Sequence, residues 1–114
     1  MTADELLRYL GFQGNYRGYK QLLFAVECVV KDEDSILNVY KCVYEVVGLR
    51  TNASAKSVEK NIRTIIKASW EKEHTRRQFE IISGYPYEEK PSTSEFLDIA
   101  ADYLRKHKDA ENVN

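Results

Sequence analysis

Basic side chains recur at helical spacing along residues 54–73 of this 114-residue chain. At about 100° per residue, Lys60, Arg63 and Lys67 lie within about 40° of Lys56, and valine and isoleucine side chains occupy the opposite side. Cations on one face of a helix can neutralise DNA phosphates, and arginine can also bind a guanine edge. A charged face opposite an apolar one is more often simply solvated. This pattern alone leaves both interpretations open.

The charges are distributed unevenly along the chain, although the whole sequence carries only −1 at pH 7. Residues 50–77 hold eight basic and three acidic side chains, whereas residues 1–49 hold five and seven and residues 78–114 hold four and eight. Net charge hides such placement, and a local excess of cations is what attracts nucleic acid. The basic middle segment therefore favours the DNA-binding interpretation.

Residues suited to other chemistry are sparse. The sequence has no glycine-rich phosphate loop, no nucleophile motif and no paired Cys/His spacing for zinc. His74 and His107 are isolated at or beyond predicted helix ends, and Cys28 and Cys42 lie in apolar segments, which predicts buried free thiols. We therefore expect no catalytic residue, no metal, no cofactor and no enzyme activity.

Sequence signals for membranes and secretion are also missing. The longest apolar run is only a few residues, and residues 1–5 lack a basic start that leads into an apolar stretch. A content of 43% hydrophobic and 31% charged residues is typical of a globular protein. We expect a cytoplasmic protein that does not bind membranes.

Helical periodicity dominates the chain, which predicts an all-α fold. At this length we expect a single compact domain of about six helices over residues 1–108, followed by a flexible tail over 109–114. Capping boxes predict the starts of the first and last helices. The first predicted helix covers residues 3–10 after Thr2, and the second covers 19–31. A deeply buried third helix runs from the acidic residues 32–34 to Gly48, and a fourth covers 54–73. The fifth is capped by Thr75 and ends at Ser83, and the sixth begins at the box Ser92 to Glu95 and frays after Lys106.

A short connection joins the two helices in the middle of the chain. Only a few residues separate Gly48, the predicted end of one helix, from Ser54, where the periodicity resumes. Either Ser54 or Asn52 can cap the second helix, because both side chains accept hydrogen bonds from free backbone N–H groups. A buried helix, a short turn and a basic helix together predict a helix-turn-helix with 54–73 as the recognition helix.

Ordered motifs spread over the chain resemble one known family. They are Arg17-Gly18-Tyr19, the stretch from Val39-Tyr40-Lys41 to Tyr44, Val58-Glu59-Lys60-Asn61-Ile62-Arg63, Ala68-Ser69-Trp70, Gly84-Tyr85, Lys90-Pro91-Ser92-Thr93-Ser94-Glu95-Phe96 and Ala101-Asp102-Tyr103-Leu104-Arg105. The chain thereby resembles the C-terminal DNA-binding domain of the stage zero sporulation protein A family, the response regulators that start endospore formation in Firmicutes. The resemblance implies a six-helix effector domain for transcription regulation, with the helix-turn-helix formed by the third and fourth helices.

Within the predicted recognition helix the resemblance is partial. The family pattern S-R-V-E-R-A-I-R-H aligns with residues 56–64, where Glu59 and Arg63 are kept. Glutamate can accept from a cytosine amino group, and arginine can bind phosphate or a guanine edge. Ser57 replaces an arginine that reads guanine in the family, and Lys60 keeps the charge of an arginine but loses its planar fork. The family's usual DNA sequence is therefore not expected to be the target.

Two further departures affect charge and hydrogen bonding. Thr64 replaces a histidine, and Lys56 replaces a serine and adds a cation, so phosphate affinity should survive better than specificity. The side chains predicted to face bases are Lys56, Ser57, Glu59, Lys60, Arg63 and Thr64. The side chains predicted to contact phosphate are Lys67, Arg76 and Arg77.

The predicted partner is double-stranded DNA, with RNA polymerase or another regulator as a further partner. We expect a monomer or a weak dimer, which could bind DNA in tandem. The alternative is a protein-interaction module that keeps the fold and has lost sequence reading. The loss of the guanine-reading arginine at Ser57 favours this alternative, and the basic stripe favours DNA.

In the family a phosphate-accepting receiver domain precedes the DNA-binding domain, whereas this sequence begins at Met1, just before the first predicted helix. Two origins stay open. The chain is either a piece of a longer regulator or a free-standing paralogue, whose control would come from expression level, a partner protein or competition for sites.

Overall fold

The computed structural model describes the backbone of residues 1–112 and the side chains of residues 1–107. Within that part of the chain all regular elements are helical, so the predicted all-α, single-domain fold is confirmed. The α-helices are α1 (Ala3–Tyr9), α2 (Tyr19–Lys31), α3 (Glu45–Thr51), α4 (Ala55–Trp70), α5 (Glu73–Ser83) and α6 (Thr93–Asn112). A 3₁₀-helix, η1 (Glu33–Asn38), and a π-helical turn, η2 (Tyr40–Tyr44), lie between α2 and α3.

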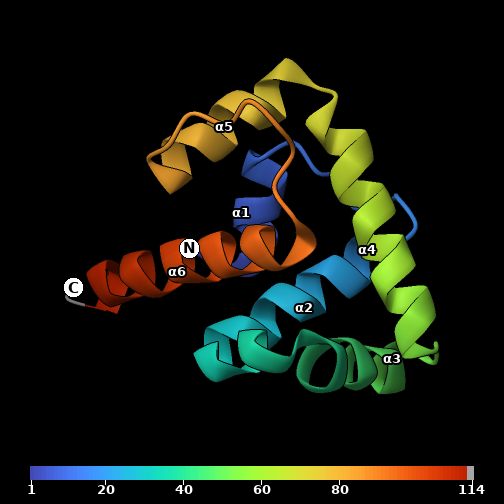
Figure 1. The fold of residues 1–114 in the computed structure, drawn as a ribbon. Helices are drawn as coiled ribbons and strands as arrows, with labels where there is room; N and C mark the ends of the chain where they lie inside the picture. Colours follow the sequence, from blue (N-terminus) through green and yellow to red (C-terminus); the bar gives the residue numbers. More distant parts are fainter. Residues whose placement is uncertain (113–114) are drawn as a thin grey trace.

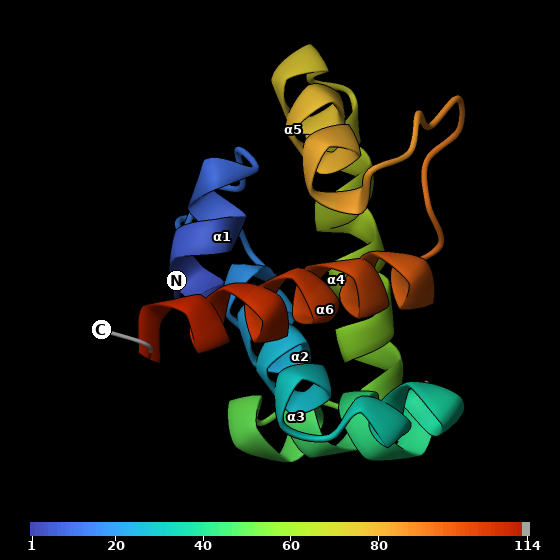
Figure 2. The same cartoon turned by 90° about the vertical axis from the view of Figure 1, so that its left-hand side faces the viewer.

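Helix α2 runs through the middle of the molecule and packs against α1, α3, α4 and α6 (Figure 1). Helix α4 stands along one edge, with its amino end at α3 and its carboxyl end at α5. Figure 2 shows α5 above α6 and α3 below it, so α4 bridges the two ends of the domain. One long side of α4 therefore lies on the outside of the fold.

Both predicted capping boxes are present. The Thr2 hydroxyl accepts from the Glu5 N–H at 3.1 Å, and the Glu5 carboxylate accepts from the Thr2 N–H at 2.9 Å. Ser92 and Glu95 form the same two bonds at 3.1 and 3.2 Å. These bonds satisfy N–H groups that a helix start leaves free, which is why the starts of α1 and α6 follow from local sequence.

An aromatic cluster ties the carboxyl end of α4 to α5 and α6. Phe79 stacks on Phe96 with ring centroids 5.3 Å apart, and Trp70 and Tyr87 meet Phe79 edge to face at 5.6 and 5.2 Å. Stacked and edge-to-face pairs are the favoured aromatic arrangements. The cluster thereby fixes where α4 ends in the core.

The segment between α2 and α4 differs from the predicted single, deeply buried helix. It divides into η1, η2 and α3, and Leu37 and Val46, both expected in the core, are 82% and 45% exposed. This segment is an outer layer of the fold, so the apolar side chains that are buried are the ones that reach inward: Val43, Tyr44 and Val47. The predicted burial of the cysteines is wrong for a related reason, because Cys42 is exposed on η2 and Cys28 is half-buried.

Two other boundaries differ from the prediction. Helix α5 begins at Glu73, so Thr75 is not its cap but a buried residue of its first turn. Helix α6 continues to Asn112 instead of fraying after Lys106. The flexibility of residues 109–114 stays a prediction, and the last two of them lie outside the described residues.

Candidate nucleic-acid interface

Helix α3 turns into α4 over residues 52–54. Asn52 has a left-handed backbone conformation (φ 56°), and its N–H donates to the Gly48 carbonyl. The Ser54 hydroxyl caps α4 by accepting from the Ser57 N–H at 3.1 Å. Of the two candidate caps the structure therefore uses Ser54. The three-residue turn has the length that a helix-turn-helix requires.

Gly48 does not end α3, contrary to the prediction. The helix continues to Thr51, because Asn52 supplies the left-handed residue that stops it. A Cβ atom at Gly48 would lie 2.4 Å from the backbone oxygen of Ala53, which is far inside van der Waals contact. The glycine is required because the turn passes directly against α3, and this contact sets the direction in which α4 leaves.

Helix α4 packs one apolar side against the domain and presents a polar side to solvent. Its buried residues recur every three or four positions: Val58, Ile62, Ile65, Ile66 and Ser69. The predicted end at Glu73 is wrong, since α4 stops at Trp70. The Trp70 ring packs against Phe79 and Tyr87, and this long-range contact turns the chain toward α5.

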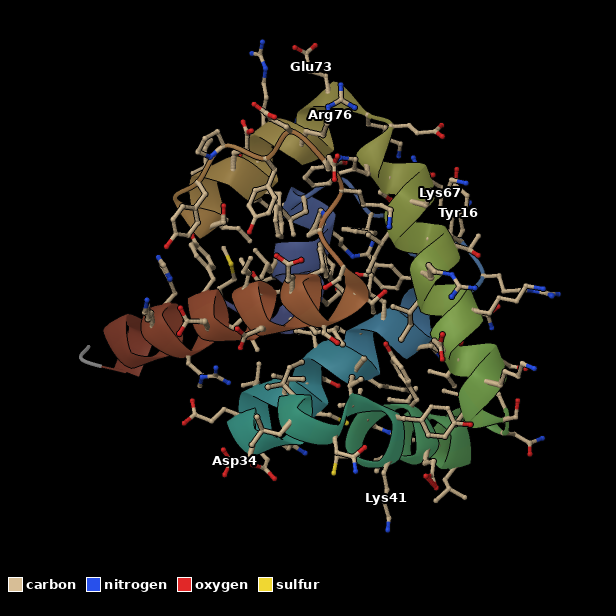
Figure 3. All side chains as sticks on the ribbon, viewed as in Figure 1. Tyr16, Asp34, Lys41, Lys67, Glu73 and Arg76 are labelled. Atoms are coloured by element: carbon tan, nitrogen blue, oxygen red, sulfur yellow. The ribbon has the colours of Figure 1, made fainter. Side chains whose placement is uncertain are left out.

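The outward side of α4 brings together the side chains predicted to face bases. Glu59 is half-buried, and the others are exposed: Lys56, Ser57, Lys60, Arg63 and Thr64. An Arg63 N–H donates to the Glu59 carboxylate at 3.3 Å, one turn away. Lys67 is exposed further along the same helix (Figure 3).

The two arginines predicted to contact phosphate belong to α5, beyond the carboxyl end of α4. An Arg76 N–H donates to the Trp70 carbonyl at 2.7 Å, so this side chain stabilises the last turn of α4. Arg77 pairs with Glu73 at 2.8 Å, and both side chains are exposed. Figure 3 shows Arg76 and Glu73 at the α5 end of the molecule. These arginines extend the basic surface but do not join the base-facing group.

A comparison with known protein families finds a match over almost the whole chain. Residues 3–104 match the family described as "Sporulation initiation factor Spo0A C terminal". The chain belongs to this family. The Spo0A C-terminal family consists of DNA-binding effector domains of a sporulation regulator and is not an enzyme family, so at this level the chain is a DNA-binding regulatory domain. The resemblance found in the sequence is thereby confirmed.

In the part of the chain that the structure describes, no helix combines the length and hydropathy of a membrane span.

Behind the exposed face, side-chain hydrogen bonds join α4 to α2 and α3. The Asn61 amide donates to the Gln21 side-chain oxygen at 3.0 Å, and the Gln21 amide donates to the Thr51 hydroxyl at 3.2 Å. Thr51 in turn donates to the Val47 carbonyl at 2.8 Å. Sequence reasoning missed this network. The signal was Asn61 itself, which stands where the aligned Spo0A C-terminal pattern has alanine.

Tyr44 of η2 lies close to the Glu59–Arg63 pair. Burial raises the pKa of Tyr44, and the negative charge of Glu59 raises it further. A hydrogen bond with Thr93, at the start of α6, acts in the opposite direction. The phenol is therefore neutral at physiological pH.

Proposed function

We propose that this domain regulates transcription by inserting α4 into the major groove of double-stranded DNA. The observation that carries the proposal is the outward side of α4, where Lys56, Lys60, Arg63 and Lys67 are all exposed on a helix joined to α3 by a three-residue turn. A groove about 12 Å wide admits one α-helix, and cations along that helix are attracted by the phosphates on either side.

Individual roles follow from side-chain chemistry. Glu59 accepts a hydrogen bond from a cytosine amino group, and Arg63 donates to a guanine edge or to phosphate. Lys56, Ser57, Lys60 and Thr64 complete the base-facing group. Lys67, Arg76 and Arg77 contact phosphates, and Arg76 can do so with the N–H groups that are not bound to Trp70.

A second candidate function is protein interaction without sequence reading. The outer layer of η1 and α3 favours it, because Leu37 and Leu49 are exposed there by more than four-fifths of their surface. Large apolar side chains that a fold leaves exposed are candidates for a protein-binding surface. The serine at position 57 favours it as well, since a hydroxyl cannot replace the bidentate contact of arginine with guanine.

Selection from a random duplex pool separates the two functions. The affinity of this chain for the enriched duplex is then compared with its affinity for a scrambled duplex at two salt concentrations. A regulator should enrich a short motif and bind it at least about 10³-fold more tightly than the scrambled duplex. If no motif emerges and binding disappears near physiological salt, sequence-specific regulation is ruled out and protein interaction becomes the better assignment.

A further inference from the structure

A basic cavity opens beside α4, outside the group of residues considered so far. It has a volume of about 550 Å³ and lies between the start of α2, the end of α3 and the middle of α4. Arg17, Lys20 and Arg50 line it together with the amide side chains of Asn52 and Asn61. Among the described residues that line this cavity, none is acidic. Gln21 also lines it, and a cavity with three cations and three amide groups suits an oxyanion with several acceptor oxygens.

The cavity lies on the Asn61 flank of α4, to one side of the cation stripe. At about 100° per residue, Asn61 is roughly 100° to 160° around the helix from Lys60, Lys67, Lys56 and Arg63, with Ser57 and Thr64 between them. The loop before α2 passes along this flank in Figure 1, and a Cβ at Gly18 would come within 3.0 Å of the Asn61 backbone oxygen. Positive charge therefore lies both on the base-facing side of α4 and in the cavity beside its Asn61 flank.

Arg50 is already oriented for such a ligand. Its guanidinium lies over the Phe24 ring, 3.7 Å from the centroid, and its nearest carboxylate contact, Glu27, is 3.9 Å away and partly exposed. Stacking holds the plane of the guanidinium and leaves N–H groups at its edge available. Tyr19 begins α2 at this cavity, so the partial positive charge at the amino end of the helix adds to the three side-chain charges.

We infer that Arg17, Lys20 and Arg50 bind backbone phosphates of the DNA, on the strand that borders the groove along the Asn61 flank of α4. The inference rests on the proposed insertion of α4 into the major groove. That groove is bordered by one phosphate strand on each side, so cations beside α4 that bind one of these strands hold the helix in its register. The cavity residues thus position α4 but read no base.

The test compares Arg17→Gln and Lys20→Gln, alone and combined, with the matched control Lys31→Gln, which removes an exposed lysine at the other end of α2. Fluorescence anisotropy gives the affinity for the selected duplex and for a scrambled duplex over a range of salt. Each single cavity variant should weaken the binding of both duplexes by the same factor and reduce the slope of log K against log salt by about 0.9, and the combined variant should reduce it by about 1.8. Lys31→Gln should leave the slope unchanged. Arg50→Gln is added only after urea denaturation shows that it folds, because Arg50 packs on Phe24.

The outcomes separate this inference from the proposed function. If a motif is enriched but the cavity variants keep the wild-type slope, the cavity assignment is overturned and α4 insertion stands. If no motif is enriched but the salt slopes of the cavity variants are still smaller than that of the wild type, the cavity binds DNA phosphate and the proposal that the domain reads a DNA sequence is wrong. The inference would also be overturned if inorganic phosphate bound saturably in the cavity while the cavity variants kept the wild-type affinity for DNA. The ligand of the cavity would then be a free anion.

Discussion

Arg63 and Glu59 form an ion pair on the outer side of α4, with Nη1 3.3 Å from Oε1. Both side chains are more than one-third exposed, and an exposed pair one turn apart contributes only about 0.3–0.5 kcal/mol to helix stability. The two charged residues that match the family pattern are therefore bound to each other weakly in the free domain. DNA can separate them at little cost, because a phosphate or guanine edge replaces the carboxylate as the partner of Arg63.

Glu59→Ala is expected to relax specificity at one base pair, because the acceptor for a cytosine amino group is lost. Lys67→Ala should instead weaken all sequences about equally, since a phosphate contact carries no sequence information. Affinities measured for a panel of duplexes, each altered at one position of the selected motif, distinguish the two patterns. Equal effects of both substitutions at every position would show that the roles are assigned wrongly.

Asn61→Ala is expected to lower the free energy of unfolding by about 1 kcal/mol. Gln21 is only 9% exposed, and the substitution removes the donor to its side-chain oxygen. An unpaired buried polar group costs about 1–3 kcal/mol, which exceeds the gain of about 0.5 kcal/mol from the higher helix propensity of alanine. Urea denaturation gives the value, and Thr64→Ala on the exposed side is the control, with a change within about 0.5 kcal/mol. An unchanged stability for Asn61→Ala would mean that the network does not hold α4.

The starts of α1, α4 and α6 could be predicted because each depends on bonds within four residues. Ser54 bonds to the Ser57 N–H, and the two capping boxes are equally local. The fold class and the buried side of α4 also followed from the spacing of apolar residues. This spacing shows which side of a helix is buried even when the element that packs against it is unknown.

Other features depend on contacts between distant segments. In the sequence, a glycine that ends a helix looks the same as a glycine that lets another segment approach the helix closely. For Gly48, only the position of Ala53 in the fold shows that the second role applies. The end of α4 depends on Trp70 meeting Tyr87. Arg17 and Arg50 lie 33 positions apart in the sequence, so no motif could show that they line one cavity.

Asp4→Asn is expected to destabilise the domain at neutral pH but not in acid. The hydroxyl of Tyr19, the first residue of α2, donates to the Asp4 carboxylate, and this bond, followed by that of Arg8, lowers the pKa of Asp4. The stabilisation is therefore fully present above the ordinary aspartate value of about 3.9 and is lost as the pH falls through the lower folded-state pKa. Urea denaturation between pH 7 and pH 2 should show the gap between variant and wild type closing in acid.

The matched variant is Tyr19→Phe, which removes the donor and leaves the carboxylate. Burial, followed by the bond to Asp4, raises the pKa of Tyr19 to about 12, so the phenol is protonated over this whole pH range. Tyr19→Phe should show a gap with the same pH dependence, and the double variant should be less destabilised than the sum of the two single changes. A gap that stays constant from pH 7 to pH 2 would contradict the assignment to Asp4.

Gly48→Ala is expected to weaken DNA binding and to destabilise the domain by about 2 kcal/mol or more, although alanine is the better helix former. The added Cβ would lie 2.4 Å from the Ala53 carbonyl oxygen, so the backbone of the turn must move and α4 must change direction. The control is Leu49→Ala in the same helix, where the side chain is 88% exposed and its loss should change stability by less than about 0.5 kcal/mol. Urea denaturation and anisotropy with the selected duplex measure both effects. A Gly48→Ala protein that is as stable as wild type and binds the duplex with wild-type affinity would show that the approach of the turn to α3 does not set the position of the recognition helix.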